Sequence, residues 1–148
     1  MSGDAEMMKL YSKRILALAA GISHTARLDA PDGSARKRSP LCGSSVAVDI
    51  RLVDGRISEY GQDVKACALG QAAAAVVSSQ IIGRTAEDIG KAQAELRAML
   101  TAGGPPPSPP FDGLEALYPA KDFKNRHASI MLTLDAIMDA FDAAKARA

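Results

Sequence analysis

The chain has 148 residues, of which 47% are hydrophobic and 24% charged, so it is long enough to fold as one domain around its own core. Its 18 lysines and arginines nearly balance its 17 aspartates and glutamates, which argues against a nucleic-acid-binding protein, because such proteins usually carry an excess of positive charge. Tryptophan is absent and aromatic residues make up only 4%, so aliphatic side chains and methionine have to build the core.

The N-terminal sequence gives no sign of a membrane or secreted protein. Residues 1–14 lack the basic-then-apolar order of a signal peptide, and the apolar run at 15–20 is too short to span a membrane. Two cysteines cannot build a disulfide framework, which favours a reducing compartment. We therefore expect a cytoplasmic protein that does not enter the membrane.

The first predicted element is an amphipathic helix over residues 4–20, whose apolar residues recur at helical spacing (Met7, Leu10, Tyr11, Ile15 and Leu18). Residues 21–40 are polar and irregular and are predicted to form a loop. This loop contains a small basic cluster of Arg36, Lys37 and Arg38. We interpret the cluster as a solvated loop, with docking of an acidic partner as the alternative.

A β-hairpin is predicted next. Apolar residues alternate with more polar ones from Val46 to Leu52, which is the pattern of a half-buried strand. Asp54 and Gly55 suit a tight turn that needs positive φ, and a return strand is predicted over residues 57–64.

Three helices are expected after the hairpin. Residues 68–82 are alanine-rich and apolar almost all round, which predicts a buried helix. The sequence from Thr85 to Asp88 has the pattern of a capping box that opens a second helix, which ends at Gly103.

A connector separates these two helices from the third. Residues 103–110 are rich in glycine and proline and are predicted to be a stiff, exposed connector that folding does not require.

The last helix is marked by apolar residues at helical spacing (Met131, Leu134, Ile137, Met138 and Phe141), after a short turn near residues 114–118. These elements predict a single α+β domain over residues 1–148, in which a small antiparallel β-sheet packs against several α-helices.

The two cysteines flank the predicted hairpin. Cys42 comes before its first strand, and Cys67 comes directly before a helix, where free backbone N–H groups favour negative charge. Because an antiparallel hairpin returns the chain to its starting end, Cys42 and Cys67 are expected to lie close together. Paired thiolates bind soft metals or attack sulfur, whereas the alternative is that both cysteines only fill the core.

His127 is the one plausible further ligand, in a segment predicted to precede the last helix, whereas His24 is interpreted as incidental. Motifs of catalysis are lacking: there is no phosphate-binding glycine loop, no Gly-x-Ser-x-Gly sequence and no prominent carboxylate pair. We therefore do not expect an enzyme.

The sequence resembles the iron–sulfur cluster scaffold family of the IscU, NifU N-terminal and SufU type, and the SufU-like branch in particular. The similarity covers roughly residues 20–145 and is carried by "PLCG" with Cys42, the hairpin, "KACALGQAAAA" with Cys67, "GRTAED" and "GLEAL". The family has aspartate after Cys-Gly, where this chain has Ser44.

The third cysteine of the family is missing. One alignment register puts Ser129 at its position, and a register shifted by one puts Ala128 there and His127 at a family histidine. A ligand set of Cys42, Cys67 and His127 is therefore one expectation, and a degenerate site is the other.

The resemblance implies a scaffold or carrier that holds a labile iron–sulfur cluster, or a single zinc or iron ion, in a site open on one side. It also implies a cysteine desulfurase as sulfur donor and iron–sulfur apoproteins as acceptors, and it leaves homodimerisation around a shared cluster open. A zinc-dependent sulfur acceptor, in which Cys42 takes a persulfide from the desulfurase, is the first alternative. A metal-free interaction protein is the second.

Overall fold

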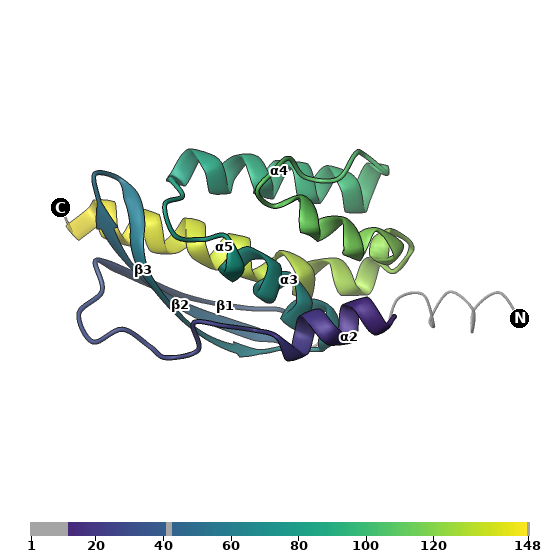
Figure 1. Cartoon of the computed structure of the whole chain (residues 1–148), viewed down its shortest axis with the longest axis horizontal. Helices are drawn as coiled ribbons and strands as arrows, with labels where there is room; N and C mark the ends of the chain where they lie inside the picture. The colour runs from purple at the N-terminus through teal and green to yellow at the C-terminus, as the bar shows by residue number, and fades with distance from the viewer. Residues whose placement is uncertain (1–11, 41–42, 148) are drawn as a thin grey trace, which may run out of the picture.

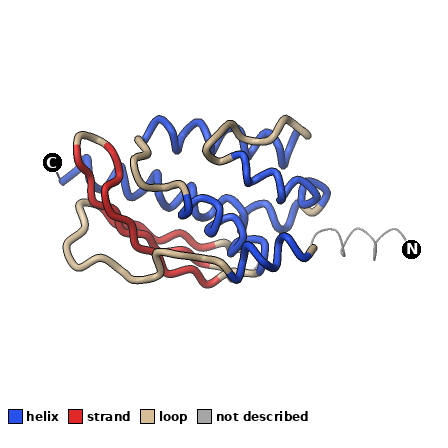
Figure 2. The backbone as a smooth tube through the Cα atoms, in the orientation of Figure 1, coloured by secondary structure: helices blue, strands red, loops and turns tan. Residues whose placement is uncertain are grey.

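The computed structural model describes residues 12–40 and 43–147, which form one α+β unit with a three-stranded antiparallel sheet on one side and the helices on the other (Figure 1). The predicted fold class is therefore confirmed. Figure 2 shows that the helices lie together over one face of the sheet, so the core forms between the two layers.

The sheet has the order β1-β2-β3, with β1 over Gly33–Arg38, β2 over Ser45–Val53 and β3 over Arg56–Lys65. The predicted hairpin is confirmed as β2 and β3. Its turn holds Asp54 at φ 53° and Gly55 at φ 76°, which is the left-handed backbone that the Asp-Gly sequence predicts. Val46, Val48 and Ile50 point into the core, so alternation of apolar residues positions the hairpin under the helices.

Strand β1 was not predicted, because its residues are mostly charged and small. It pairs with β2 at the edge of the sheet and packs below the last helix. At its first residue a Cβ on Gly33 would collide with the backbone carbonyl of Ala140. Glycine is therefore required at this position, where no room is left for a side chain between the strand and this helix.

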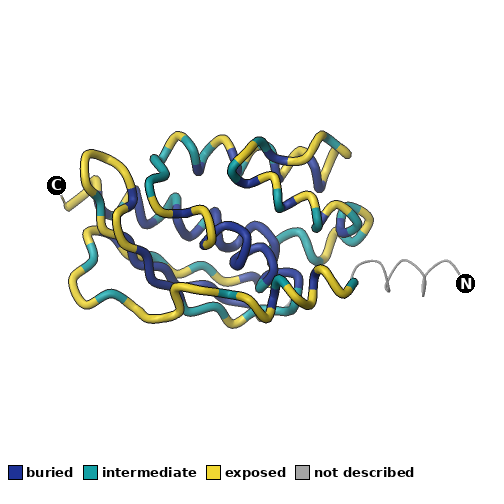
Figure 3. The backbone as a smooth tube through the Cα atoms, viewed as in Figure 1, coloured by how far each residue is buried: buried dark blue, intermediate teal, exposed yellow. Residues whose placement is uncertain are grey.

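The described helices are α2 (Lys13–Ala20), α3 (Ala68–Ser79), α4 (Ala86–Ala102), the 3-10 helix η1 (Asp112–Asp122) and α5 (Lys124–Arg147). Helix α3 is the most enclosed of them, since 9 of its 12 residues are buried, as Figure 3 shows along its backbone. It contacts α2, α5, η1 and β3. Helix α5 connects the layers, because it contacts β1 and β2 on one side and α4 on the other.

The helix boundaries agree with the sequence signals at two sites. Thr85 and Asp88 form the predicted capping box, and Gly103 ends α4 at φ 66°. The last helix differs, because it begins at Lys124, so that His127 lies inside its first turns and not before it. Helix α2 occupies the second half of the helix predicted over residues 4–20, whose earlier half lies outside the described residues.

An ion pair between the half-exposed Arg27 and the buried carboxylate of Asp49 fixes residues 21–32 against the outer face of the sheet. The carboxylate of Asp49, whose side chain is 2% exposed, accepts hydrogen bonds from Arg27 (Nη2 to Oδ1, 2.8 Å), from Ser34 Oγ (2.6 Å) and from the backbone N–H of Leu28 (3.0 Å). Hydrogen bonding from Arg27 lowers the pKa of Asp49 to about 2. This network explains how a polar segment without regular structure is held in one conformation.

The proline-rich connector is not simply exposed, which corrects one expectation. Pro107 is buried, and Ser108 donates its backbone N–H and its hydroxyl to the two carboxylate oxygens of Glu95 on α4, at 3.2 and 2.8 Å. These hydrogen bonds hold the pKa of Glu95 below its usual value. The connector therefore packs along α4 and carries the chain to Phe111, which lies in the core.

Replacing Ser108 by alanine is expected to lower the free energy of unfolding by about 1–2 kcal/mol, because hydrogen bonds to a charged group are stronger than neutral ones. Pro105→Ala, at an exposed position of the same connector, is the matched control and should change it by no more than about 0.5 kcal/mol. Urea denaturation of both variants measures the difference. Equal stability of the two variants would mean that the contact with Glu95 contributes nothing.

Candidate metal and sulfur site

Cys67 occupies the N-cap of α3, as the sequence predicted. Its backbone is extended (φ −65°, ψ 171°), its carbonyl starts the helix by accepting from Gln71 N–H (2.9 Å), and its side chain makes no capping hydrogen bond. The thiol is partly exposed and packs against the edge of the core. It therefore lies next to the unpaired N–H groups of the first turn, where negative charge is favoured.

A row of hydroxyl groups connects this thiol to the start of β2. Cys67 Sγ lies 3.5 Å from Ser129 Oγ of α5, and Ser129 donates to Ser44 Oγ at 3.1 Å. Ser129 and Ser44 are buried, with 1% and 4% of their surface exposed. Residues more than 60 positions apart in the chain are thus brought together at one end of the sheet.

The protons of this row can be arranged in two ways. A hydroxyl has one proton, so while Ser129 donates to Ser44, the Cys67 thiol is the donor to Ser129. A deprotonated Cys67 would instead accept from Ser129. The row can therefore adapt to a thiol or to a thiolate without moving the backbone.

Helix α3 approaches α5 closely at this site. A Cβ on Gly70 would lie 2.7 Å from Ser129 Oγ and 3.2 Å from its carbonyl oxygen, so glycine leaves the space that Ser129 occupies. The importance of Gly70 and of the Ser44 hydroxyl was missed in the sequence, where only their places next to the cysteines could have indicated them.

His127 lies elsewhere on α5. Its ring Nε2 donates to the carbonyl oxygen of Ala120 at 2.9 Å, and the residue lines a cavity of about 250 Å³ with Arg97 and Met131. Residues two positions apart on an α-helix point in nearly opposite directions, so His127 and Ser129 face different sides of α5. The structure thus brings Ser129, and not His127, into contact with Cys67.

Two candidate residues from the sequence remain, Cys42 and His24. Cys42 lies outside the described residues, so its predicted proximity to Cys67 stays a prediction. His24 packs edge-on against Tyr60 (ring centroids 6.0 Å apart) and accepts from Gln62 N–H through its carbonyl at 2.9 Å. Within residues 12–40 and 43–147, no three histidine, cysteine or acidic side chains form a group that could hold a metal ion.

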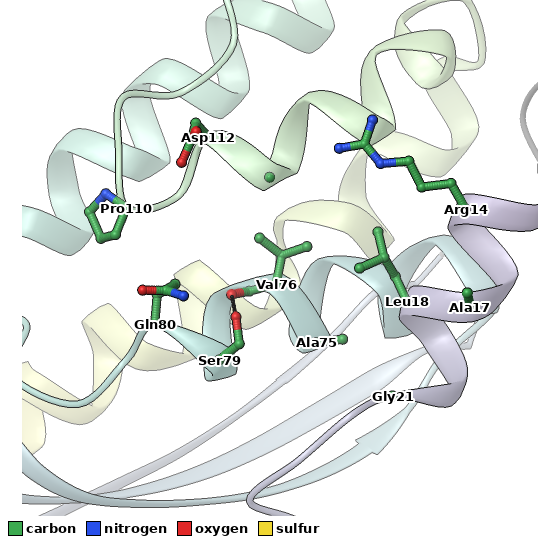
Figure 4. A pocket seen from close by; sticks show the side chains of 11 residues that line it. Arg14, Ala17, Leu18, Gly21, Ala75, Val76, Ser79, Gln80, Pro110 and Asp112 are labelled. Atoms are coloured by element: carbon green, nitrogen blue, oxygen red, sulfur yellow. Dashed lines mark hydrogen bonds between the residues drawn. The ribbon is translucent and has the colours of Figure 1, made fainter.

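A separate apolar cavity of about 570 Å³ lies between α2, α3 and the start of η1 (Figure 4). Leu18 of α2 and Val76 of α3 line it, as do Arg14 and Asp112. Neither Cys67 nor His127 lines it.

In the part of the chain that the structure describes, no helix is long and apolar enough to cross a membrane.

Comparison with solved structures identifies the family. The fold superposes with a TM-score of 0.93 on the crystal structure of a nitrogen-fixing NifU-like protein (N-terminal) from Brucella abortus, at 37% sequence identity over 97% of this chain and 99% of that one. The chain belongs to the NifU-like family. No family model and no curated protein matches the sequence.

A second solved structure, of lower sequence identity, shares the fold of this NifU-like domain. It is SufU from the thermophile Fervidobacterium islandicum AW-1, named as a candidate iron–sulfur cluster assembly scaffold of the SUF system. Its TM-score is 0.80 at 18% identity, with 90% of this chain and 98% of that chain covered. The expected resemblance to the NifU and SufU fold is therefore confirmed.

Proposed function

We propose that this NifU-like protein is an iron–sulfur cluster assembly scaffold or carrier, which holds a labile cluster or a single metal ion as cargo. The observation that carries the proposal is the position of Cys67 at the N-cap of α3, beside Ser129 and Ser44, in a chain 37% identical to a NifU-like domain. Thiolates are the ligands that iron–sulfur clusters use, and a helix N-terminus stabilises their negative charge.

In this proposal Cys42 and Cys67 supply two thiolate ligands. His127 is the third ligand expected from the sequence, and to reach the site it would have to leave the carbonyl of Ala120. Ser129 is the alternative third group, since its hydroxyl already contacts Cys67. Two strong ligands and one weak one would give a site that releases its cargo readily, which suits a carrier.

The proposed partners are a cysteine desulfurase that donates sulfur and iron–sulfur apoproteins that accept the cluster. The protein itself would bind and transfer cargo without catalysing a reaction. Such work requires reduced thiols, and we propose a reducing compartment such as the cytoplasm.

Anaerobic reconstitution with ferrous iron and sulfide tests the function. The unmodified protein is expected to retain iron and sulfide after desalting and to absorb visible light, whereas Cys42→Ser and Cys67→Ser should each retain close to none. Ser78→Ala, which changes a buried serine of the same helix, is the matched control and should behave as the unmodified protein.

The same measurements distinguish the alternatives. Retention of zinc without sulfide, together with a persulfide on Cys42 after incubation with desulfurase and cysteine, would replace the scaffold proposal by a zinc-dependent sulfur acceptor. Absence of iron, zinc and sulfide from protein purified without oxygen, and from the reconstituted sample, would leave a metal-free interaction protein.

A further inference from the structure

Unpaired positive charge gathers on the outer face of the sheet, next to the candidate site. Lys37 of β1 points to the helix layer, where it pairs with Asp139 of α5 at 3.1 Å. Because side chains alternate along a strand, Arg36 and Arg38 point to the opposite face, as Ser34 does where it bonds Asp49. Both arginines are exposed, and neither makes an ion pair within the described residues.

The strand register brings a third cation to the same corner. Arg38 lies opposite Ser45, and Ser45 lies opposite Lys65, so these three residues form one row across the sheet. Neighbouring strands are about 4.8 Å apart, so the backbones of Arg38 and Lys65, which are two strands apart, lie about 10 Å from each other across the sheet. We call Arg36, Arg38 and Lys65 the cationic face.

The rest of this side of the sheet is electrically balanced. Arg27 pairs with the buried Asp49, and Arg51 pairs with Glu59 at 3.3 Å nearer the hairpin turn. Among the described residues, the acid that pairs with a member of the cationic face is Asp63, which lies 4.0 Å from Lys65 and thus offsets one of the three charges. The whole chain carries a net charge of only +1, so this excess is local.

The cationic face lies at the same end of the sheet as the site, with its arginines on the side away from the helix layer. Lys65 ends β3 two residues before Cys67, and Ser45 follows Ser44, whose hydroxyl belongs to the row that reaches the thiol. A protein large enough to cover this end of the sheet could therefore contact these cations and also reach the end of the sheet where Cys67 lies. Charges on an edge strand also discourage aggregation, and that role alone would need no partner.

We infer that the cationic face docks an acidic protein surface, that of the desulfurase which delivers sulfur to the site that contains Cys67. The inference rests on the proposed function and adds where the donor binds and what charge its surface carries. Electrostatic attraction between such surfaces speeds association and positions the partners, and it weakens as salt is added.

The test compares two variants with the same change in charge. Arg36→Glu/Arg38→Glu reverses the cationic face, and Lys91→Glu/Lys145→Glu reverses two exposed lysines on α4 and on the last turn of α5. Binding to the cysteine desulfurase of the same organism is measured by surface plasmon resonance. Arg36→Gln/Arg38→Gln serves if the charge reversal prevents folding.

The first variant is expected to raise Kd by about tenfold or more at low salt, and the lysine variant by less than about twofold. The difference should shrink between about 0.01 M and 0.15 M salt, where the Debye length falls from about 30 to about 8 Å. Equal effects of the two variants, or no binding of the unmodified protein, would overturn the inference. The proposed function would survive that result if the protein still assembles a cluster from inorganic iron and sulfide, and would fail separately if it does not.

Discussion

Replacing Ser129 by cysteine is expected to increase the iron and sulfide retained after reconstitution and to slow their loss to a chelator by about tenfold or more. The hydroxyl of Ser129 lies 3.5 Å from Cys67 Sγ, so a thiol at this position would face the same space. Thiolate is the stronger ligand for iron and zinc, and changes to groups that only orient a metal ligand already alter affinity by about 10–100-fold. Metal analysis and chelator competition measure the effect.

Two further variants decide which group is the third ligand. Ser129→Ala is expected to lower retention modestly if the hydroxyl only donates a hydrogen bond, and to abolish it if the oxygen is a ligand. His127→Ala should abolish retention if the imidazole is the ligand that the sequence predicted. No gain of affinity in Ser129→Cys, together with loss in His127→Ala, would reject the assignment of Ser129 to the third position.

Replacing Asp49 by alanine is expected to lower the free energy of unfolding by about 2–3 kcal/mol, because hydrogen bonds to a buried charged group are lost, and this is a large part of the stability of a small domain. The substitution removes a buried carboxylate and leaves the Ser34 hydroxyl and the Leu28 N–H without their acceptor. It also frees Arg27 and, with it, the segment that crosses the outer face of the sheet. Chemical denaturation measures the loss.

Acid should reproduce part of this effect. The pKa of Asp49 is lowered from 3.8 to about 2 in the folded protein, so its stabilisation is complete above pH 4 and is lost as the pH falls towards 2. A shift of this size corresponds to about 2 kcal/mol. Asp139→Asn, which removes a half-exposed surface pair with Lys37, is the control and should cost less than about 1 kcal/mol. An Asp49→Asn variant with an unchanged acid-unfolding profile would contradict this account.

The parts of the fold that the sequence predicted well are those with a local physical cause. Alternating apolar residues from Val46 to Leu52 and the positive φ demanded at Asp54 and Gly55 predicted the β2–β3 hairpin. The side chains of Thr85 and Asp88 determine the start of α4 by themselves. Strand β1 could not be recognised, because one of its faces meets solvent and carries arginine instead of an apolar repeat.

The candidate site was predictable only in part. That Cys67 begins a helix follows from neighbouring residues, whereas its contact with Ser129 depends on the packing of α3 against α5 through Gly70. His127 was considered a loop residue because the polar sequence around it hid the start of α5 at Lys124. The proline connector was expected to be exposed, since nothing near it in the sequence indicates that Glu95 accepts from Ser108.

The unused cap at the start of α3 has a consequence for how this protein can evolve. Serine at an N-cap usually accepts a backbone N–H and stabilises a helix by about 1 kcal/mol relative to residues that do not cap, and Cys67 makes no such bond. Cys67→Ser should therefore give a protein that is at least as stable and yet unable to hold its cargo. Folding stability alone therefore gives no reason to keep cysteine instead of serine at position 67. Only a need for the thiol would maintain Cys67 in a population against random mutation to serine.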